Sequence, residues 1–252
     1  MILASRTSIV LLIFCKFILT SNIAFANILD KAEQLYDTGH FRDAAELART
    51  IESAQAYSFA AKATLVEATF IASDKDKFAL FQQAQKDANT ALSIDQNLLD
   101  AHIQIAVAVG SIADLENPLT AFLSGYAKIG KRHLDIALSI APDDSWVHGL
   151  LGIWHLQIVN RVSALWPGKL YDASFDEGLY HCNKAEQLEN SNLQILYGCA
   201  ISLYEFNDNK YKQHAISLLQ SIVEQKPIDA TESYIVQEAR LKLNQQVAII
   251  IN

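Results

Sequence analysis

Seven histidines are the first side chains in this sequence that could do chemistry, because neutral imidazole binds transition metals. His148 and His155 are seven residues apart, so a helix would carry both on one face. No Asp, Glu or Cys joins them at ligand spacing, and a zinc site needs at least three protein ligands. The other candidates, His102, His133, His181 and His214, are scattered in the same way. The spacing therefore favours structural histidines and predicts no metal site.

Motifs for other kinds of catalysis are incomplete. Pro167-Gly168-Lys169 resembles a phosphate-binding loop only in part, because the earlier glycine and the following Ser or Thr are missing. No Gly-x-Ser-x-Gly motif occurs, and neither Cys182 nor Cys199 has a base at a recognisable spacing. The acidic groups stand where carboxylates favour helix starts: Asp143, Asp144, Asp172, Asp176 and Glu177. We expect a protein that is not an enzyme and holds no cofactor.

Aromatic side chains gather in one part of the chain. Trp146, Trp154 and Trp166 lie within 21 residues, and Tyr171 follows closely. Two interpretations are open. Large rings could fill wide gaps between long helices, or a loop over residues 164–174 could present Trp166 and Tyr171 beside a groove. Under the second, all four are candidate partner-binding residues, since Trp and Tyr dominate binding hot spots.

The first 26 residues have the pattern of a signal peptide. Arg6 precedes a largely apolar run, and Ala24-Phe25-Ala26 has the small-x-small form of a signal-peptidase site. Lys16 interrupts the run, which is therefore shorter than the roughly 18 residues of a membrane span. We expect cleavage after Ala26 and export to a bacterial periplasm or out of the cell; an uncleaved anchor is the alternative.

Cleavage would leave 226 residues with 18 basic and 28 acidic side chains, a net charge of −10. Such a charge repels phosphate backbones, so nucleic acid is not expected as a partner. Four prolines and nine glycines in a chain that is 51% hydrophobic favour long helices over disorder. We expect one helical domain over residues 27–246, with no membrane span after cleavage.

One helical pattern occurs five times: a small residue, an apolar residue four positions later, another three after that, and a break five residues on. The copies begin at Ala44, Ala84, Gly130, Gly178 and Ala215, and their breaks fall at Ala56, Gln96, Pro142, Asn190 and Pro227. Ala or Gly lets two helices cross closely. Each copy follows another helical run, which predicts five helix pairs, near 28–53, 56–94, 98–140, 145–189 and 192–224, and a last helix over 230–246.

These pairs resemble tetratricopeptide (TPR) repeats. The matching positions of the first copy are Ala32, Leu35, Gly39, Phe41, Ala44 and Ala48, and the family's Leu-Gly pair is matched by Leu151-Gly152 and Tyr197-Gly198. The small residues are 40, 46, 48 and 37 positions apart instead of the family's roughly 34. Such long repeats are similar to a divergent branch that includes the regulator of microtubule dynamics proteins, their bacterial relatives and the periplasmic TatT proteins.

The resemblance implies an all-α, right-handed α-α superhelix, a TPR-like solenoid of about five helix pairs plus a C-terminal helix. First helices of the pairs should line its concave face. The implied function is a non-enzymatic adaptor that binds a protein or peptide in that groove. TatT proteins assist solute transport, so a small molecule enclosed by an apolar channel near Trp154 and Trp166 is an alternative. A structural role in an envelope complex is another.

Cys182 and Cys199 lie almost equidistant from the turn between the fourth and fifth pairs, so antiparallel helices carry them at about the same height. In an oxidising compartment they can pair if their Cα atoms lie within about 7 Å. Two buried free thiols are the alternative.

The C-terminal tail, residues 247–252, is apolar through Val247 to Ile251. It could pack on the final pair, or it could form a docking strand or an oligomer contact.

Overall fold

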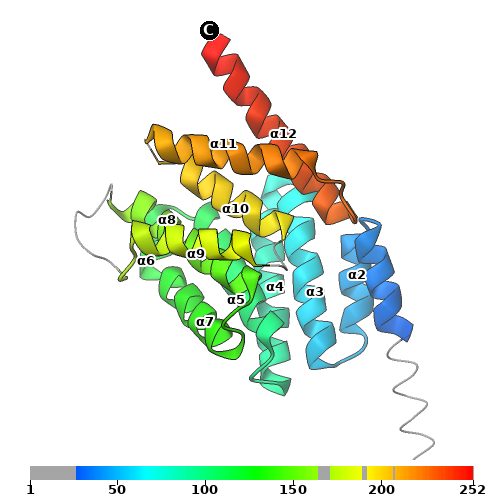
Figure 1. Cartoon of the computed structure of the whole chain (residues 1–252). Helices are drawn as coiled ribbons and strands as arrows, with labels where there is room; N and C mark the ends of the chain where they lie inside the picture. The colour runs from blue at the N-terminus through cyan, green and yellow to red at the C-terminus, as the bar shows by residue number, and fades with distance from the viewer. Residues whose placement is uncertain (1–26, 164–170, 189–191, 207, 252) are drawn as a thin grey trace, which may run out of the picture.

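The computed structural model describes residues 27–163, 171–188, 192–206 and 208–251. Within these ranges the chain consists of helices and turns and contains no strand (Figure 1). The first helix covers residues 27–37, and it is followed by α2 (Phe41–Arg49), α3 (Ala54–Val66) with the π-helix η1 (Glu67–Ile71), α4 (Asp74–Ile94), α5 (Leu99–Leu115), α6 (Pro118–Leu123), α7 (Tyr126–Ile140), α8 (Ser145–Ser163), α9 (Phe175–Gln187), α10 (Leu193–Tyr204), α11 (Asn209–Glu224) and α12 (Ala230–Ile251).

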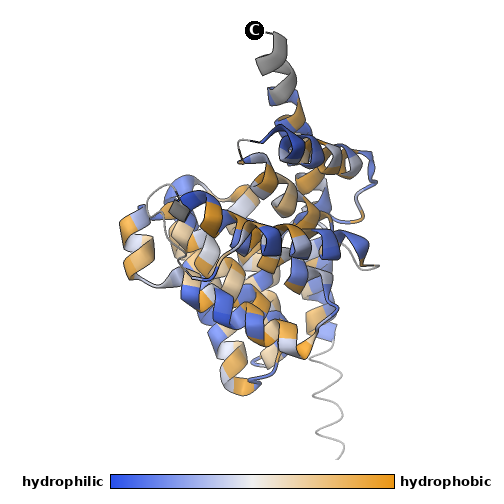
Figure 2. Cartoon of the chain, turned by 60° about the vertical axis from the view of Figure 1, so that its left-hand side comes forward, coloured by the Kyte–Doolittle hydropathy of each residue, from blue (hydrophilic) through white to orange (hydrophobic). Residues whose placement is uncertain are grey.

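The predicted solenoid of five helix pairs is confirmed. The pairs are the first helix with α2, α3 with α4, α5 with α7, α8 with α9, and α10 with α11, and α12 follows them. Consecutive helices pack side by side, and hydrophobic and hydrophilic residues alternate along each ribbon (Figure 2). This alternation is expected of helices that bury one stripe against their neighbours. In the described part of the chain, no helix has the length and apolar character needed to span a membrane.

Two local elements differ from the prediction. The third pair contains an extra short helix, α6, which begins with Asn117 as its N-cap and Pro118 in its first turn. The Asn117 carboxamide oxygen accepts a hydrogen bond from the Thr120 backbone N–H at 3.0 Å. In the second pair, α3 ends in the π-helix η1, which carries Phe70. Six and five residues are too few to show a helical period of their own, so the periodicity alone could not reveal these elements.

Glycines mark the closest helix crossings, as the repeat pattern predicts. A Cβ added to Gly152 of α8 would lie 2.6 Å from the Cys182 sulfur and 2.8 Å from the Cys182 backbone nitrogen on α9. A Cβ added to Gly178 of α9 would lie 2.7 Å from Cγ of Leu156 on α8. Two helices can approach this closely only where a side chain is absent.

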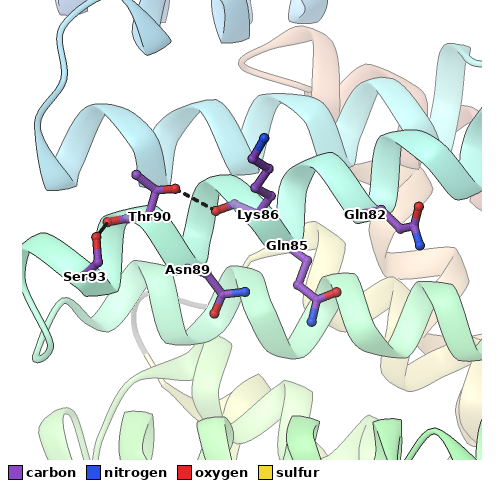
Figure 3. A pocket seen from close by; sticks show the side chains of 6 residues that line it. All are labelled: Gln82, Gln85, Lys86, Asn89, Thr90 and Ser93. Carbon is purple, nitrogen blue, oxygen red and sulfur yellow. Dashed lines mark hydrogen bonds between the residues drawn. The ribbon is translucent and has the colours of Figure 1, made fainter.

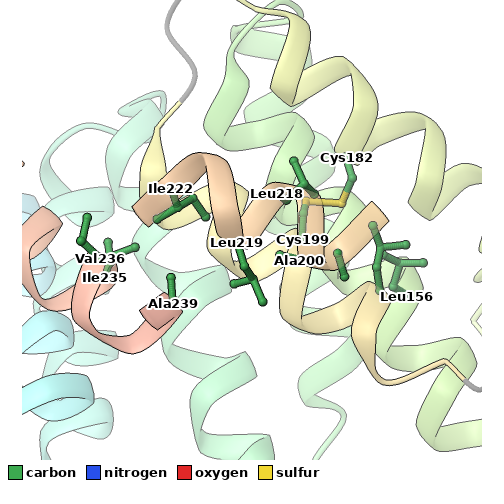
Figure 4. Packing of buried hydrophobic residues seen from close by; sticks show 12 residues of the cluster. Leu156, Cys182, Cys199, Ala200, Leu218, Leu219, Ile222, Ile235, Val236 and Ala239 are labelled. Atoms are coloured by element: carbon green, nitrogen blue, oxygen red, sulfur yellow. A yellow bond between two sulfur atoms is a disulfide. The ribbon is translucent and has the colours of Figure 1, made fainter. Parts of the chain in front are cut away.

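The cysteines lie at the contact between the fourth and fifth pairs. The structure joins the sulfur atoms of Cys182 on α9 and Cys199 on α10, and their Cα atoms are 5.9 Å apart (Figure 4). Both cysteines are buried in an apolar cluster with side chains of α8, α11 and α12. Leu218 lies next to the sulfur bridge in this cluster (Figure 4).

The last helix reaches further than the prediction. Instead of ending near Gln246, α12 runs to Ile251, so the apolar residues from Val247 onward continue the helix and do not form a docking strand. The beginning of α12 packs on the last pair and also lies beside the N-terminal helices (Figure 1). The idea that its end makes an oligomer contact stays a prediction.

Contacts between α12 and the first pair are specific. The Thr231 hydroxyl donates a hydrogen bond to the Tyr36 hydroxyl at 3.0 Å. The Tyr234 ring stacks on Phe70 of η1 with centroids 5.5 Å apart and lies 6.2 Å from the Phe41 ring. We call this contact the α12 clasp, because it joins the two ends of the solenoid.

The glycine geometry predicts opposite effects for two Gly→Ala substitutions. Gly152→Ala should lower the free energy of unfolding by about 1–3 kcal/mol, since the new methyl group overlaps backbone atoms of α9 that cannot move aside. Gly110→Ala in α5 should raise it by about 0.5–1 kcal/mol, because Gly110 is exposed and nothing lies within 4 Å of its added Cβ. Urea unfolding of both variants tests this; equal midpoints would contradict it.

Candidate functional site

The candidate site is a concave groove lined by the first helices of all five pairs. Its volume is about 550 Å³, which lies in the range of ligand sites. The lining residues come from the helix over 27–37, α3, α5, α10 and the start of α8. The second helices contribute none of the described lining residues. This arrangement is the one that the resemblance to TPR repeats implies.

One wall of the groove is aromatic. Tyr36, Phe59 and Trp146 come from the first helix, α3 and α8 respectively, and they line the same space. The Tyr36 and Phe59 rings meet edge to face with centroids 5.6 Å apart. Burial, with smaller effects from Asp229 and Asp37, raises the pKa of Tyr36 above its ordinary value in spite of its hydrogen bond to Thr231. Its phenol therefore stays neutral, and the buried ring supports Phe59 and Lys62 at the groove wall.

The charges along the groove are mostly negative. Four carboxylates line it, those of Glu33, Asp37, Asp100 and Asp144, and Lys62 is the one basic residue among its described lining residues. The Lys62 nitrogen stands 4.6 Å from the centre of the Tyr36 ring, a cation–π distance. An approaching ligand therefore meets a negative potential beside an aromatic surface.

A smaller and more apolar pocket lies between α5, α7 and α8. It encloses about 200 Å³, and its lining includes Val109, Gly110, Leu134 and Trp154. The Trp154 indole N–H donates to the Ala127 carbonyl at 3.0 Å, which fixes the ring as one wall. Arg161 of α8 pairs with Asp114 of α5, and both residues belong to the lining.

The structure places three of the four predicted partner-binding residues, and only one of them lines the concave groove. Trp146 lines the concave groove, whereas Trp154 lines the smaller pocket. Tyr171 lies on the side of α7, a second helix, in a shallow depression that Trp154 also borders. There Lys128 lies 5.9 Å from the Tyr171 ring, and burial raises the pKa of the Tyr171 phenol. Trp166 falls outside the described residues.

Another concavity, of about 490 Å³, lies along α4 (Figure 3). All six lining residues, Gln82, Gln85, Lys86, Asn89, Thr90 and Ser93, are polar and belong to this one helix. The hydroxyls of Thr90 and Ser93 donate to carbonyls of α4 itself, at 3.0 and 2.7 Å (Figure 3). A ligand here would find no second wall, so this surface is a weaker candidate than the concave groove.

Four of the histidines form two buried pairs. His102 on α5 and His133 on α7 place their Nδ1 atoms 2.8 Å apart, and His148 on α8 and His181 on α9 do the same at 2.8 Å. Each pair joins the two helices of one repeat. The pairs occupy equivalent repeat positions, since His133 and His181 both stand three residues after the small residues Gly130 and Gly178.

The hydrogen bonds define the tautomers of these pairs. His102 Nε2 lies 3.0 Å from the Gln96 carbonyl, and His148 Nε2 lies 2.8 Å from the Pro142 carbonyl. A carbonyl only accepts, so each Nε2 carries the proton and each Nδ1 accepts from the partner histidine. Burial foremost, and then the neighbouring histidine, lower the pKa of His133 and of His181 to about 4. The pairs are structural links between helices, because both Nδ1 atoms of each pair and the Nε2 atoms of His102 and His148 are held in hydrogen bonds.

His155, the second histidine of the candidate metal pair, is engaged separately. Its Nδ1 accepts the backbone N–H of Ser174 at 3.2 Å. Burial, followed by the charge of Lys131, lowers its pKa. Among the described residues no group of three or more His, Cys, Asp or Glu side chains could hold a metal ion.

Comparison with known proteins places this architecture in a family. Residues 28–247 match the family described as Regulator of microtubule dynamics protein 1-3. The match covers all five helix pairs and the clasp. The chain belongs to this family.

Two members of the regulator of microtubule dynamics family show how much is shared. The chain is 26% identical to Regulator of microtubule dynamics protein 1 of Bos taurus over 176 residues, which is 64% of this chain and 54% of the bovine protein. It is 29% identical to Regulator of microtubule dynamics protein 3 of Rattus norvegicus over 143 residues, 54% of this chain and 28% of the rat protein. The chain thus spans about half of the first relative and less than a third of the second.

Among solved structures, a thermophilic TPR protein of Thermus thermophilus is similar in fold. The likeness has a TM-score of 0.61 at 18% identity and covers 86% of this chain and 99% of that protein. At this identity it establishes the fold alone, a TPR-like solenoid.

Sequence reasoning missed the histidine pairs and the acidic groove. The histidines carried a signal in their spacing: His102 and His148 stand six residues after the repeat breaks at Gln96 and Pro142. An alignment of the third and fourth copies would therefore have shown that both copies carry histidines at the same two positions. The groove carried a weaker signal, because Glu33, Asp100 and Asp144 belong to helices that are far apart in sequence and come together only when the pairs stack.

The low pKa of the paired histidines predicts a loss of stability in mild acid. The folded state keeps His133 and His181 neutral down to about pH 4, whereas the unfolded chain protonates them near 6.5. The unfolded state then binds more protons, so the free energy of unfolding should fall by roughly 1–3 kcal/mol per histidine as pH drops through this window. Urea midpoints measured between these limits test the slope.

A double variant isolates this effect from the carboxylates. His133→Asn and His181→Asn keep an N–H near the Nδ1 position but do not titrate, so the combined variant should lose most of the slope above pH 5, which lies between the two pKa values. If the urea midpoint of the parent protein stays constant between about pH 4 and 6.5, the histidine pairs are not the acid-sensitive element.

Proposed function

We propose that this member of the regulator of microtubule dynamics family is a non-enzymatic adaptor that binds a segment of a partner protein in its concave groove. The observation that carries the proposal is the lining of the groove, to which all five first helices contribute. Stacked helices in contact lie about 8–10 Å apart, so five of them offer a surface of up to about 35 Å. An extended segment of about ten residues has this length.

The character of the lining supports a polypeptide occupant. Three glutamines, Gln55, Gln104 and Gln194, come from α3, α5 and α10, and amide side chains can pair with both the N–H and the C=O of an extended backbone. Phe59 and Trp146 offer apolar surface for a side chain of the partner. The TPR-like fold provides the rigid support, since the groove helices α3, α5, α8 and α10 each pack against several other helices.

A photo-crosslinking experiment tests the groove. A benzophenone amino acid in place of Gln104, inside the groove, should cross-link to partner polypeptides when the chain is expressed in cells. The same replacement of Gln85, a half-buried glutamine of α4 that does not line the groove, is the matched control. We expect covalent products from position 104 alone, and Trp146→Ala should reduce their yield by about tenfold, as loss of an anchor residue does. Identical products from both positions would rule out the groove.

A second candidate function uses the smaller pocket. Its lining is mainly apolar and it borders Trp154, the residue at which a channel for a transported small molecule was expected. Gly110 lines this pocket with open space at its Cβ, so Gly110→Leu would fill the pocket without displacing the backbone. If the pocket binds a ligand, this variant loses the ligand that native mass spectrometry detects on the parent protein. Retention of the ligand by the variant would rule out this function.

We further propose that the chain is exported after cleavage at Ala26, as the N-terminal pattern indicates. The buried neighbourhood of Cys182 and Cys199 supports this proposal, because a sulfur bridge there requires an oxidising compartment. The periplasm of a bacterium is the compartment that fits the signal pattern. The named relatives come from Bos taurus and Rattus norvegicus, and they lend this location no support of their own.

Thiol counting tests this proposal. Protein recovered from the exported fraction should begin at Asn27 and contain no free thiol, because the two remaining cysteines are paired. Reduction should lower the free energy of unfolding by about 3 kcal/mol, the value for a loop of this length. Cys182→Ser with Cys199→Ser should show the same loss and no further response to reductant. Two free thiols in unfolded, unreduced protein would contradict the pairing.

A further inference from the structure

We propose that the concave groove selects a cationic segment of polypeptide, one in which Lys or Arg alternates with apolar side chains. This inference rests on the proposed function, since it names the chemistry of the segment that the groove binds. Three observations on the groove carry it: its unpaired carboxylates, its own lysine, and a buried hydroxyl with no partner.

The carboxylates of the groove are not neutralised by the protein. Glu33, Asp37, Asp100 and Asp144 all line it, and none of the four forms an ion pair with a described residue. Asp100 and Asp144 also favour the starts of α5 and α8. Glu33 and Asp37 have no such role. Asp37 ends the first helix, where the helix dipole disfavours an anion, so its charge has a cost that folding does not explain.

Lys62 shows how the groove receives a cation. Its ammonium group lies 4.6 Å from the centre of the Tyr36 ring, inside the groove, and Asp37 adjoins that tyrosine in the chain. Lys62 already covers the Tyr36 ring, which is itself only 3% exposed. The half-buried rings of Phe59 and Trp146, in contrast, line the same groove as the carboxylates and are available to a partner's Lys or Arg. With four acids against one base, the groove can take further positive charge before it is neutral.

A buried hydroxyl points to a polypeptide backbone as the remaining component. In the described part of the chain, two buried side-chain oxygens lack a hydrogen-bond partner, and one of them is Oγ of Ser58. Ser58 of α3 is only 3% exposed yet lines the groove, between Gln55 and Phe59. An unpaired buried hydroxyl is unfavourable, and a bound peptide group would satisfy it. A small cation alone would not need the amide-rich surface that surrounds it.

Three labelled peptides test the charge preference on the mature chain. Each has about ten residues, the extended length of the groove, with the same two Phe anchors and either Lys, Gln or Glu at four positions. Fluorescence anisotropy should give the order Lys, Gln, Glu from tightest to weakest, with the Lys peptide bound at least about tenfold more tightly than the Gln peptide. The difference should largely vanish at about 1 M salt, where the screening length is about 3 Å.

Matched charge variants locate the effect. Glu33→Gln, Asp37→Asn and Asp100→Asn together should lower the affinity for the Lys peptide to that for the Gln peptide. The control combines Glu46→Gln, Glu186→Gln and Glu224→Gln, which remove the same net charge from exposed positions on α2, α9 and α11. We expect the control to stay within about twofold of the parent, since distant exposed charges are screened. Equal weakening by both sets would overturn the assignment to the groove.

Ser58→Ala separates a ligand contact from a structural role. Removing an unpaired buried hydroxyl should raise the urea midpoint, whereas loss of a backbone contact should weaken binding of the Lys peptide by at least about threefold. A variant that is more stable and binds unchanged would overturn the role of Ser58.

The remaining outcomes distinguish the two proposals. Equal binding of all three peptides would overturn the cationic preference and leave the groove as a peptide site. No binding of any peptide would overturn both. Displacement of the Lys peptide by an equal concentration of spermidine would show that the groove recognises charge alone and would overturn the polypeptide assignment.

Discussion

The structure depends on the α12 clasp, the contact through which the last helix holds the first pair. Thr231 and Tyr36 are 195 residues apart in the chain and share a buried hydrogen bond, while Tyr234 packs on Phe41 and Phe70. In an open solenoid each repeat contacts only its neighbours, so the end repeats are the least supported. Here the first pair is fixed from both sides. The helix over residues 27–37 can therefore serve as a wall of the groove.

The spacing of small and apolar residues along the chain predicted the helix pairs, because contacts between neighbouring helices depend on these residues. The small residue at Gly178 marked a real helix crossing, because its close approach to Leu156 excludes a Cβ, whereas Gly130 leaves room for one. The clasp has no such signal. Its aromatic residues fit an ordinary buried helix face, and only the curvature summed over five pairs brings Tyr234 to Phe41. The short helix α6 and the π-helix η1 were also missed, since elements of six and five residues are shorter than the window over which a helical period can be recognised.

The candidate site shows the same division. Trp146 was identified as an unusual residue, and it does line the groove. Trp154 and Tyr171, identified by the same argument, lie elsewhere, because clustering in sequence does not imply one surface when helices alternate between two layers. Of the four groove carboxylates, only Asp144 was singled out from the sequence, and it was interpreted as a helix-start carboxylate. That role is real for Asp144, which accepts the Val147 N–H at 3.0 Å, and it concealed the fact that the starts of successive first helices meet along one groove.

The histidine pairs support the groove in the third and fourth repeats, as the ion pair between Arg49 of α2 and the buried Asp87 of α4 does nearer the N-terminus. Each histidine pair joins a first helix to its second helix through neutral hydrogen bonds, so the buried contact carries no charge to be compensated. The groove keeps a net negative lining, four carboxylates with one lysine, that a partner can reach. A wall that is already fixed loses little conformational entropy when a ligand binds. Affinity then depends on the match between the ligand and the lining, which makes charge and aromatic contacts in the groove the determinants of specificity.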